Sequence, residues 1–179
     1  MFNNSLKAAA GLTLLACTIL ALTSISTHKW TVLTSGSIGL WKSCDEQGCV
    51  DISKDQHHKG KVPEWLYVVR AFGCLSIITY FITFTYHILS WVILTSSRHS
   101  YITTVFIITS GGLMFLSMAL YTRNFDEHDF KWGWSYYLGW VSFLLTLASF
   151  SISLVYSRSA AKEEERIRKR SEILIFEDY

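Results

Sequence analysis

Four long apolar runs without a charged side chain constrain the fold of this chain more than any other feature. They are residues 8–25, 71–94, 101–120 and 136–156, and none contains Asp, Glu, Lys or Arg. Each is about the 17–25 residues that a helix needs to cross roughly 30 Å of hydrocarbon. A soluble bundle is the alternative, and it would carry charges along one face of every helix. These runs are apolar or Ser/Thr on all sides and too long for barrel strands, so they predict four membrane-spanning helices.

These runs divide the chain into a membrane domain, residues 1–157, and a cytosolic tail, residues 158–179. We place the spans at about residues 8–27, 66–94, 101–122 and 135–157, with outside loops at 28–65 and 123–134. In the tail, Glu164 with Arg168 and Glu165 with Lys169 form pairs four residues apart, which continue the helix beyond the membrane. The first run also fits a signal peptide, but its length and the three later spans favour a retained helix.

Small residues at intervals of three or four line two of the spans. In the first span they are Ala9, Thr13, Cys17 and Ala21, and in the fourth they are Ser142, Thr146, Ser149 and Ser153. Packing drives helix association in lipid, because lipid tails are as apolar as the side chains. We therefore expect close helix contacts along both stripes.

The loop after the first span holds two tryptophans and a cysteine pair. Trp30–Leu33 and Ser37–Trp41 mix β-branched, aromatic and small residues around a Ser-Gly turn, which predicts two short strands. Residues 45–61 are hydrophilic and predict an irregular connection.

Cys44 and Cys49 are close enough in sequence to bond, because the residues between them include Gly48, which eases a tight turn. A zinc site shared with His57 and His58 is the competing interpretation. Zinc needs four ligands at a defined geometry, and a His-His pair further along the loop matches that poorly. The spacing favours a disulfide that fixes local shape more than global stability, because the closed loop is short.

Four spans place both termini on one side, and we predict that this side is the cytosol. Basic residues are equally numerous on the two sides under this arrangement, so the positive-inside rule does not decide. The cysteine pair does decide, since cytosolic thiols would stay reduced. We expect a plasma membrane protein with cytosolic termini, and an intracellular vesicle or granule membrane is the alternative.

Aromatic side chains gather where the fourth span begins. Trp132, Trp134, Tyr136 and Trp140 are expected at the headgroup level, where amphipathic rings are most stable. Arg70 lies one turn into the second span, and we expect it to reach the membrane surface or to pair with an acidic residue of the loop.

Four features occur together in this chain: Trp30, the triplet Gly39-Leu40-Trp41, the Cys44/Cys49 pair and the four spans. In combination they resemble the claudin, peripheral myelin protein and epithelial membrane protein superfamily. The short cysteine spacing is similar to the branch of lens fibre membrane intrinsic protein and the epithelial membrane proteins. Other segments similar to that branch are residues 70–72 (RAF), 119–122 (ALYT) and 134–141 (WSYYLGWV). The resemblance covers about residues 5–157.

The resemblance implies an all-α membrane fold, a left-handed bundle of four transmembrane helices topped by a small extracellular antiparallel β-sheet. In such a fold Trp30 and the Gly39-Leu40-Trp41 triplet anchor the sheet to the bundle. Gly39 then allows the close backbone approach that is needed where a tryptophan tucks under the sheet. Two features depart from the family pattern: the first loop lacks a glycosylation sequon, and the chain ends Glu177-Asp178-Tyr179 in place of the claudin Tyr-Val.

The predicted function is not enzymatic, and no cofactor or metal is expected. The apolar runs hold no paired carboxylates, no His-x-x-x-His spacing and no Ser/His/Asp set. No basic run interleaved with aromatic residues points to nucleic acid. We expect a protein that organises membrane or cell-cell contacts through its first outside loop. Its partners would be the lipid bilayer and other membrane proteins, beside it or on an apposed cell, including further copies of itself.

Two other functions are compatible with the resemblance. One is a claudin-type component of a paracellular barrier or channel, and the other is an auxiliary subunit that regulates an ion channel. The lysines and acidic residues of the first loop balance, so the sequence shows no single-sign field of the kind that selects ions.

Overall fold

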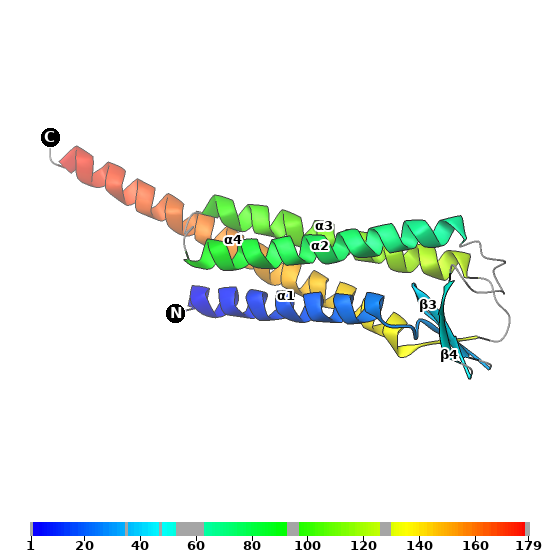
Figure 1. The fold of residues 1–179 in the computed structure, drawn as a ribbon. Helices are drawn as coiled ribbons and strands as arrows, with labels where there is room; N and C mark the ends of the chain where they lie inside the picture. The colour runs from blue at the N-terminus through cyan, green and yellow to red at the C-terminus, as the bar shows by residue number, and fades with distance from the viewer. Residues whose placement is uncertain are drawn as a thin grey trace.

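The computed structural model describes residues 2–34, 36–46, 48–52, 63–92, 97–125 and 130–177, without the side chains of residues 2–4, 97, 98, 100 and 173–177. This part of the chain forms four helices that run lengthwise through the molecule (Figure 1). They are α1 (Phe2–Ser26), α2 (Glu64–Val92), α3 (Ser97–Asn124) and α4 (Trp134–Glu177). Both termini lie at one end of the molecule, and the strands lie at the other.

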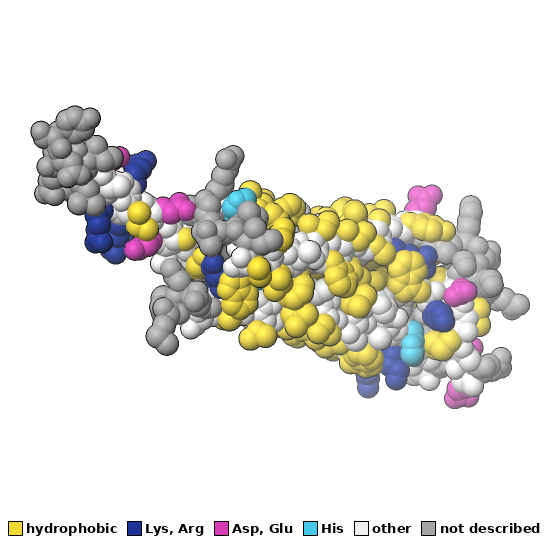
Figure 2. Space-filling view, turned by 60° about the vertical axis from the view of Figure 1, so that its left-hand side comes forward, with side chains coloured by type: hydrophobic (Ala, Val, Ile, Leu, Met, Phe, Trp, Pro, Cys, Tyr) yellow, Lys and Arg dark blue, Asp and Glu magenta, His cyan; other side chains and the backbone are white. Residues whose placement is uncertain are grey.

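All four helices are long and apolar enough to cross a membrane. Hydrophobic side chains cover the middle of the molecule in Figure 2, and charged side chains gather towards its two ends. Apolar side chains such as Leu12, Ile78 and Val105 are exposed on the outer faces of the helices. A bilayer solvates such faces, while the backbone groups in the interior of each helix are bonded within that helix. The predicted four-span membrane fold is therefore confirmed.

Many serine and threonine hydroxyls bond within the helices that carry them. Thr18 Oγ1 donates to the Leu14 carbonyl at 2.8 Å, and Thr79 Oγ1 donates to the Leu75 carbonyl at 2.9 Å. Such bonds to the preceding turn leave few hydroxyl groups to be solvated by lipid. These runs can therefore be rich in Ser and Thr and still span a membrane.

Buried hydroxyls also join neighbouring helices. Ser142 Oγ on α4 donates to the Cys17 carbonyl on α1 at 3.0 Å, and Ser117 Oγ on α3 donates to the Val69 carbonyl on α2 at 3.0 Å. On the α3–α4 contact, the hydroxyls of Thr104 and Ser153 lie 2.8 Å apart. These bonds require close approach of the helix backbones, which small side chains permit.

The buried stripe of α1 differs from the predicted four-residue spacing. Cys17 is buried as predicted, but Ala9 and Thr13, which the spacing of four also predicts to be buried, are only half-buried. Ala10 and Leu14 are buried in their place. A helix has 3.6 residues per turn, so a strict spacing of four drifts around its surface. The contact with α4 follows the helix geometry instead.

A five-stranded antiparallel sheet caps the end of the bundle opposite the termini. Its strands are β1 (Thr31–Leu33), β2 (Gly36–Ile38), β3 (Lys42–Asp45), β4 (Gly48–Asp51) and β5 (Lys131–Trp132). Their order is β4-β3-β2-β1-β5, so the second outside loop contributes an edge strand beside β1.

The sequence predicts two strands here and an irregular connection over residues 45–61. This prediction is incomplete. Residues 42–51 form the β3–β4 hairpin, and Ser37–Trp41 is a strand only as far as Ile38. Strands of two to four residues are too short to show an alternating pattern, so only their pairing partners reveal them. His57 and His58 of the zinc interpretation, residues 126–129 of the second loop and the C-terminal Asp178 and Tyr179 lie outside the described residues.

The anchor between sheet and bundle

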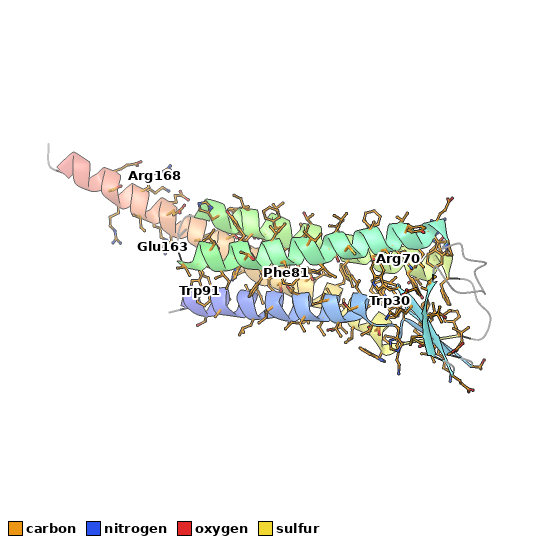
Figure 3. The ribbon with its side chains drawn as sticks, in the orientation of Figure 1. Trp30, Arg70, Phe81, Trp91, Glu163 and Arg168 are labelled. Carbon is orange, nitrogen blue, oxygen red and sulfur yellow. A yellow bond between two sulfur atoms is a disulfide. The ribbon has the colours of Figure 1, made fainter. Side chains whose placement is uncertain are left out.

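Trp30 fills the space between the sheet and the helices (Figure 3). Its side chain is 0% exposed, and its indole Nε1 donates to the Ser24 carbonyl at 2.7 Å. That carbonyl lies in the last turn of α1, where no later helical amide is present to bond it. The ring also packs edge-on against Tyr121 of α3, 4.7 Å away, and Tyr136 of α4, 6.3 Å away. One side chain thus connects three helices.

Other buried side chains surround this indole from the sheet side. Leu40 follows β2 and is fully buried, and Ile52 follows β4 and is almost fully buried. The Ile52 amide also donates to the Trp41 carbonyl at 3.1 Å, which holds the end of β4 against the chain before β3. The hydrophobic core therefore continues from the bundle into the base of the sheet.

Two glycines allow backbone segments to meet at this anchor. A Cβ on Gly39 would lie 2.5 Å from the Cα of His28 and 2.8 Å from the carbonyl oxygen of Thr27. A Cβ on Gly133 would overlap the carbonyl of Lys29, and the Gly133 amide donates to the Trp30 carbonyl at 2.8 Å. The close approach predicted at Gly39 is present, and its partner is the connection between α1 and β1. The sequence analysis missed Gly133.

Trp41 and Arg70 form a second connection, on the α2 side. Trp41 does not tuck under the sheet, since its side chain is 39% exposed, while its Nε1 donates to the Ile25 carbonyl at 3.0 Å. The Arg70 guanidinium lies 5.0 Å from the Trp41 ring centre and 5.7 Å from that of Tyr67. Arg70 Nε donates to the Leu40 carbonyl at 2.7 Å. Arg70 thus contacts the chain between β2 and β3 through the Leu40 carbonyl and the Trp41 ring. Among the described residues it forms no ion pair with an acidic residue, which was one of the two arrangements that the sequence suggests.

The four aromatic residues predicted at the headgroup level occupy different environments. Trp134 is 48% exposed at the start of α4, and Trp140 is half-buried. Trp132 stacks on Tyr136 with ring centres 4.2 Å apart. Tyr136 is only 6% exposed, and its hydroxyl lies 2.8 Å from the Thr122 hydroxyl. Tyr136 is therefore a core residue of the anchor, because the sheet covers the position where the sequence predicts lipid headgroups.

Cys44 and Cys49 are joined by a disulfide across the β3–β4 hairpin. They are direct partners in the register of the two strands, with Cα atoms 4.0 Å apart. Gly48, with φ of 141°, forms the turn that glycine favours, and its amide donates to Asp45 Oδ1 at 3.0 Å. A ring nitrogen of His28 and the two sulfur atoms all lie within 4.8 Å of one another. Bonded sulfurs are not thiolates, so this group is no zinc site in the disulfide state.

Residues 5–151 match the family model described as the PMP-22/EMP/MP20/Claudin family. The chain belongs to this family. It is 28% identical to mouse "Protein NKG7" over an alignment of 160 residues, and the match covers 82% of this chain and 89% of that protein. It is 28% identical to mouse "Claudin domain-containing protein 2" over an alignment of 159 residues, and the match covers 85% of this chain and 87% of the relative. It is also 26% identical to zebrafish (Danio rerio) "Epithelial membrane protein 2" over 134 residues, 72% of this chain and 81% of that protein.

The family match contains the sheet, the disulfide and all of the anchor, since these lie between residues 24 and 136. It ends at residue 151, within α4. The part of α4 beyond that residue therefore lies outside the match to the family model.

Proposed function

We propose that this family member is a non-enzymatic organiser of membrane contacts that acts through its sheet on the outside of the cell. The observation that carries the proposal is the fixed position of the sheet on the bundle. Trp30 and Arg70 bond the sheet region to α1 and α2, and Gly133 bonds β1 to the start of α4. A surface held at a constant height above the bilayer is suited to contact other proteins, because little further ordering is needed on binding.

The proposed orientation places the sheet outside and both termini in the cytosol. The disulfide supports it, since such bonds persist in oxidising compartments and are rare in the cytosol. The plasma membrane is the proposed location, and a vesicle or granule membrane with the sheet in the lumen satisfies the same redox condition.

The hairpin β3–β4 provides the proposed contact surface. All four residues of β4 are exposed, and β4 lies at the edge of the sheet. Val50 presents an exposed apolar side chain there, and Lys42 of β3 is opposite Asp51 of β4. An edge strand with an exposed apolar residue can bind a partner by backbone pairing and side-chain contact. The adjacent charges of both signs favour partners of mixed charge over selection of one ion.

Expression in contact-poor fibroblasts tests this proposal. We expect the protein to concentrate at cell-cell borders and to increase cell aggregation. A Val50→Lys variant should reduce both effects, because it places a charge in the apolar part of the surface. Ile167→Lys is the matched control, since Ile167 is exposed at the opposite end of the molecule, and it should behave like the wild type.

Three results would contradict the organiser function. Junctional strands with altered transepithelial resistance would assign a claudin-type barrier. Co-purification with an ion channel and a change in its gating would assign an auxiliary subunit. Equal border enrichment of the wild type and Val50→Lys would show that the hairpin is not the contact surface.

A further inference from the structure

The sulfurs of the hairpin differ in their access to solvent. Cys49 is exposed on the edge strand β4, whereas Cys44 is half-buried on β3, between β4 and β2. A nucleophile that opens a disulfide must approach the sulfur it attacks, so access favours one of the two atoms. An incoming thiolate therefore meets Cys49 first.

Charged and titratable groups lie around the bond. The His28 ring nitrogen lies within 4.8 Å of both sulfurs, and Lys29 lines a hollow in the sheet together with Cys44. Asp45 and Glu46 line the same hollow, and the Asp45 carboxylate accepts the Gly48 amide. The imidazole is the group of this set that is adjacent to the sulfurs themselves. An imidazole this close is placed to stabilise a thiolate that forms at Cys44.

The anchor of the sheet does not depend on this bond. Trp30 is held by α1, α3 and α4, and β4 keeps its pairing with β3 and the bond from the Ile52 amide to the Trp41 carbonyl. The disulfide closes a short loop, so its opening releases little chain entropy. The hairpin can thus be modified while the sheet stays on the bundle.

Cys49 is accessible to solvent, charged and titratable groups lie near the disulfide, and the anchor does not depend on this bond. We therefore propose that the Cys44–Cys49 bond is a site of S-thiolation by small thiols such as glutathione. The thiolate sulfur attacks Cys49 Sγ, a new S–S bond forms between these two atoms, and the bond from Cys49 to Cys44 breaks. Cys44 leaves as a thiolate beside the His28 ring, and the proton that the incoming thiol lost has gone to solvent. One disulfide is consumed and one is formed, so no oxidant is needed.

The modification places a charged peptide on the edge strand of the proposed contact surface. Its occurrence does not rest on the proposed function, because the chemistry depends only on the hairpin. Loss of contact-forming activity in cells would leave this site unaffected, and absence of thiolation would leave the contact function unaffected.

The test uses the full chain purified in detergent micelles and treated with excess reduced glutathione. Peptide mass spectrometry locates the adduct and gives its rate of formation. We expect the adduct on Cys49, and a rate about three- to tenfold lower in His28→Gln, because the thiolate that leaves from Cys44 then lacks the imidazole beside it.

His99→Gln is the matched control, since the His99 ring contacts Tyr86 near the opposite end of the bundle. It should react at the wild-type rate. Equal rates for the two histidine variants would overturn the proposal. If His28→Gln does not fold, the wild type alone decides. An adduct on Cys44 would refute the site. The absence of any adduct while Trp30 keeps its buried fluorescence would refute it as well.

Discussion

At the scale of single residues, Trp30 explains why the sheet has one position on the bundle. Its ring contacts helices that are distant in sequence, and its N–H satisfies a carbonyl at the end of α1. Phenylalanine could fill much of this space but could not supply the donor. Position 30 therefore needs both the area and the polar edge of an indole.

We predict that Trp30→Phe lowers stability by about 2–4 kcal/mol, because it removes buried volume and the indole hydrogen bond to the Ser24 carbonyl, which then keeps only the bond from Thr27 Oγ1 at 3.2 Å. The measurement is thermal unfolding in detergent micelles. Trp134→Phe is the control, since that ring is largely exposed, and it should have little effect. Similar losses for both variants would contradict the anchor.

Gly39→Ala should destabilise the protein by about 1–3 kcal/mol, as overpacking does in other cores. The added Cβ meets backbone atoms of Thr27 and His28, which cannot rotate away as a side chain can. Gly112→Ala is the paired control, because nothing lies within 4 Å of its Cβ position and alanine is the better helix former. The thermal unfolding midpoint should fall for Gly39→Ala and stay unchanged or rise for Gly112→Ala. An unchanged midpoint for Gly39→Ala would disprove the close approach.

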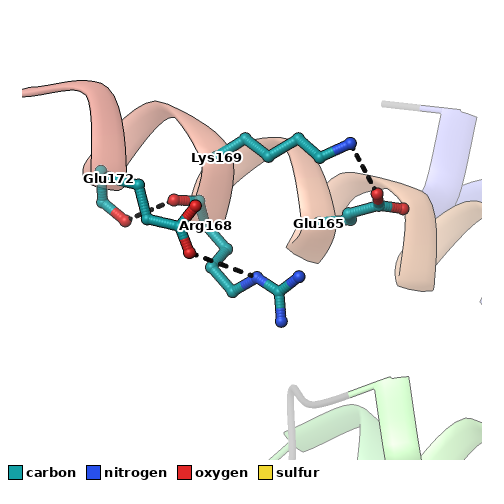
Figure 4. Close-up of polar contacts among 5 residues, drawn as sticks. Glu165, Arg168, Lys169 and Glu172 are labelled. Atoms are coloured by element: carbon teal, nitrogen blue, oxygen red, sulfur yellow. Dashed lines mark hydrogen bonds and ion pairs between the residues drawn. The ribbon is translucent and has the colours of Figure 1, made fainter.

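At the scale of elements, α4 differs from the other helices because it extends past them at the end that holds the termini (Figure 1). Residues 162–172 of this extension are exposed. Figure 4 shows ion pairs within it, Lys169 Nζ with Glu165 Oε1 at 2.8 Å and Arg168 Nε with Glu172 Oε1 at 3.8 Å. Pairs of this spacing stabilise a helix in water without any contact with the bundle.

Removal of residues 162–179 should therefore leave the unfolding midpoint of the bundle unchanged. Exposed ion pairs contribute little to stability, and the described side chains of this segment are solvated. Ser142→Val is the positive control, because it removes the bond to the Cys17 carbonyl and crowds the α1–α4 contact. A large drop in the midpoint after truncation would show that the extension packs on the bundle.

At the scale of the whole molecule, the two ends are chemically distinct. One end carries the disulfide-bonded sheet, and the other carries both termini and the charged extension of α4. The apolar belt between them fixes the molecule across the bilayer. Orientation then decides which end meets the cytosol.

Cysteine labelling tests that orientation. We expect Lys131→Cys, on β5, to react with a membrane-impermeant maleimide on intact cells. Ile167→Cys, on the extension of α4, should react only after permeabilisation. Wild-type Cys17 and Cys74 lie within helices and provide the background. The reverse pattern would place the sheet in the cytosol and refute the proposed topology.

The membrane fold could be read from the sequence because its cause is local. An uninterrupted apolar run must be helical in lipid, whatever its neighbours are, since the backbone has no other way to bond. The same holds for Gly48 in its turn and for the cysteines beside it, whose spacing lets a tight turn bring them within bonding distance. Fold class and the disulfide were thus determined by residues close together in the chain.

The arrangement of the anchor was decided by the tertiary structure. The sequence places Tyr136 among lipid headgroups, but β5 and Trp132 cover it, and Arg70 holds Trp41 at the surface. Gly133 has meaning only beside the partner that another segment brings to it. Burial and hydrogen bonding at these positions depend on contacts between distant parts of the chain, and no local pattern records such contacts.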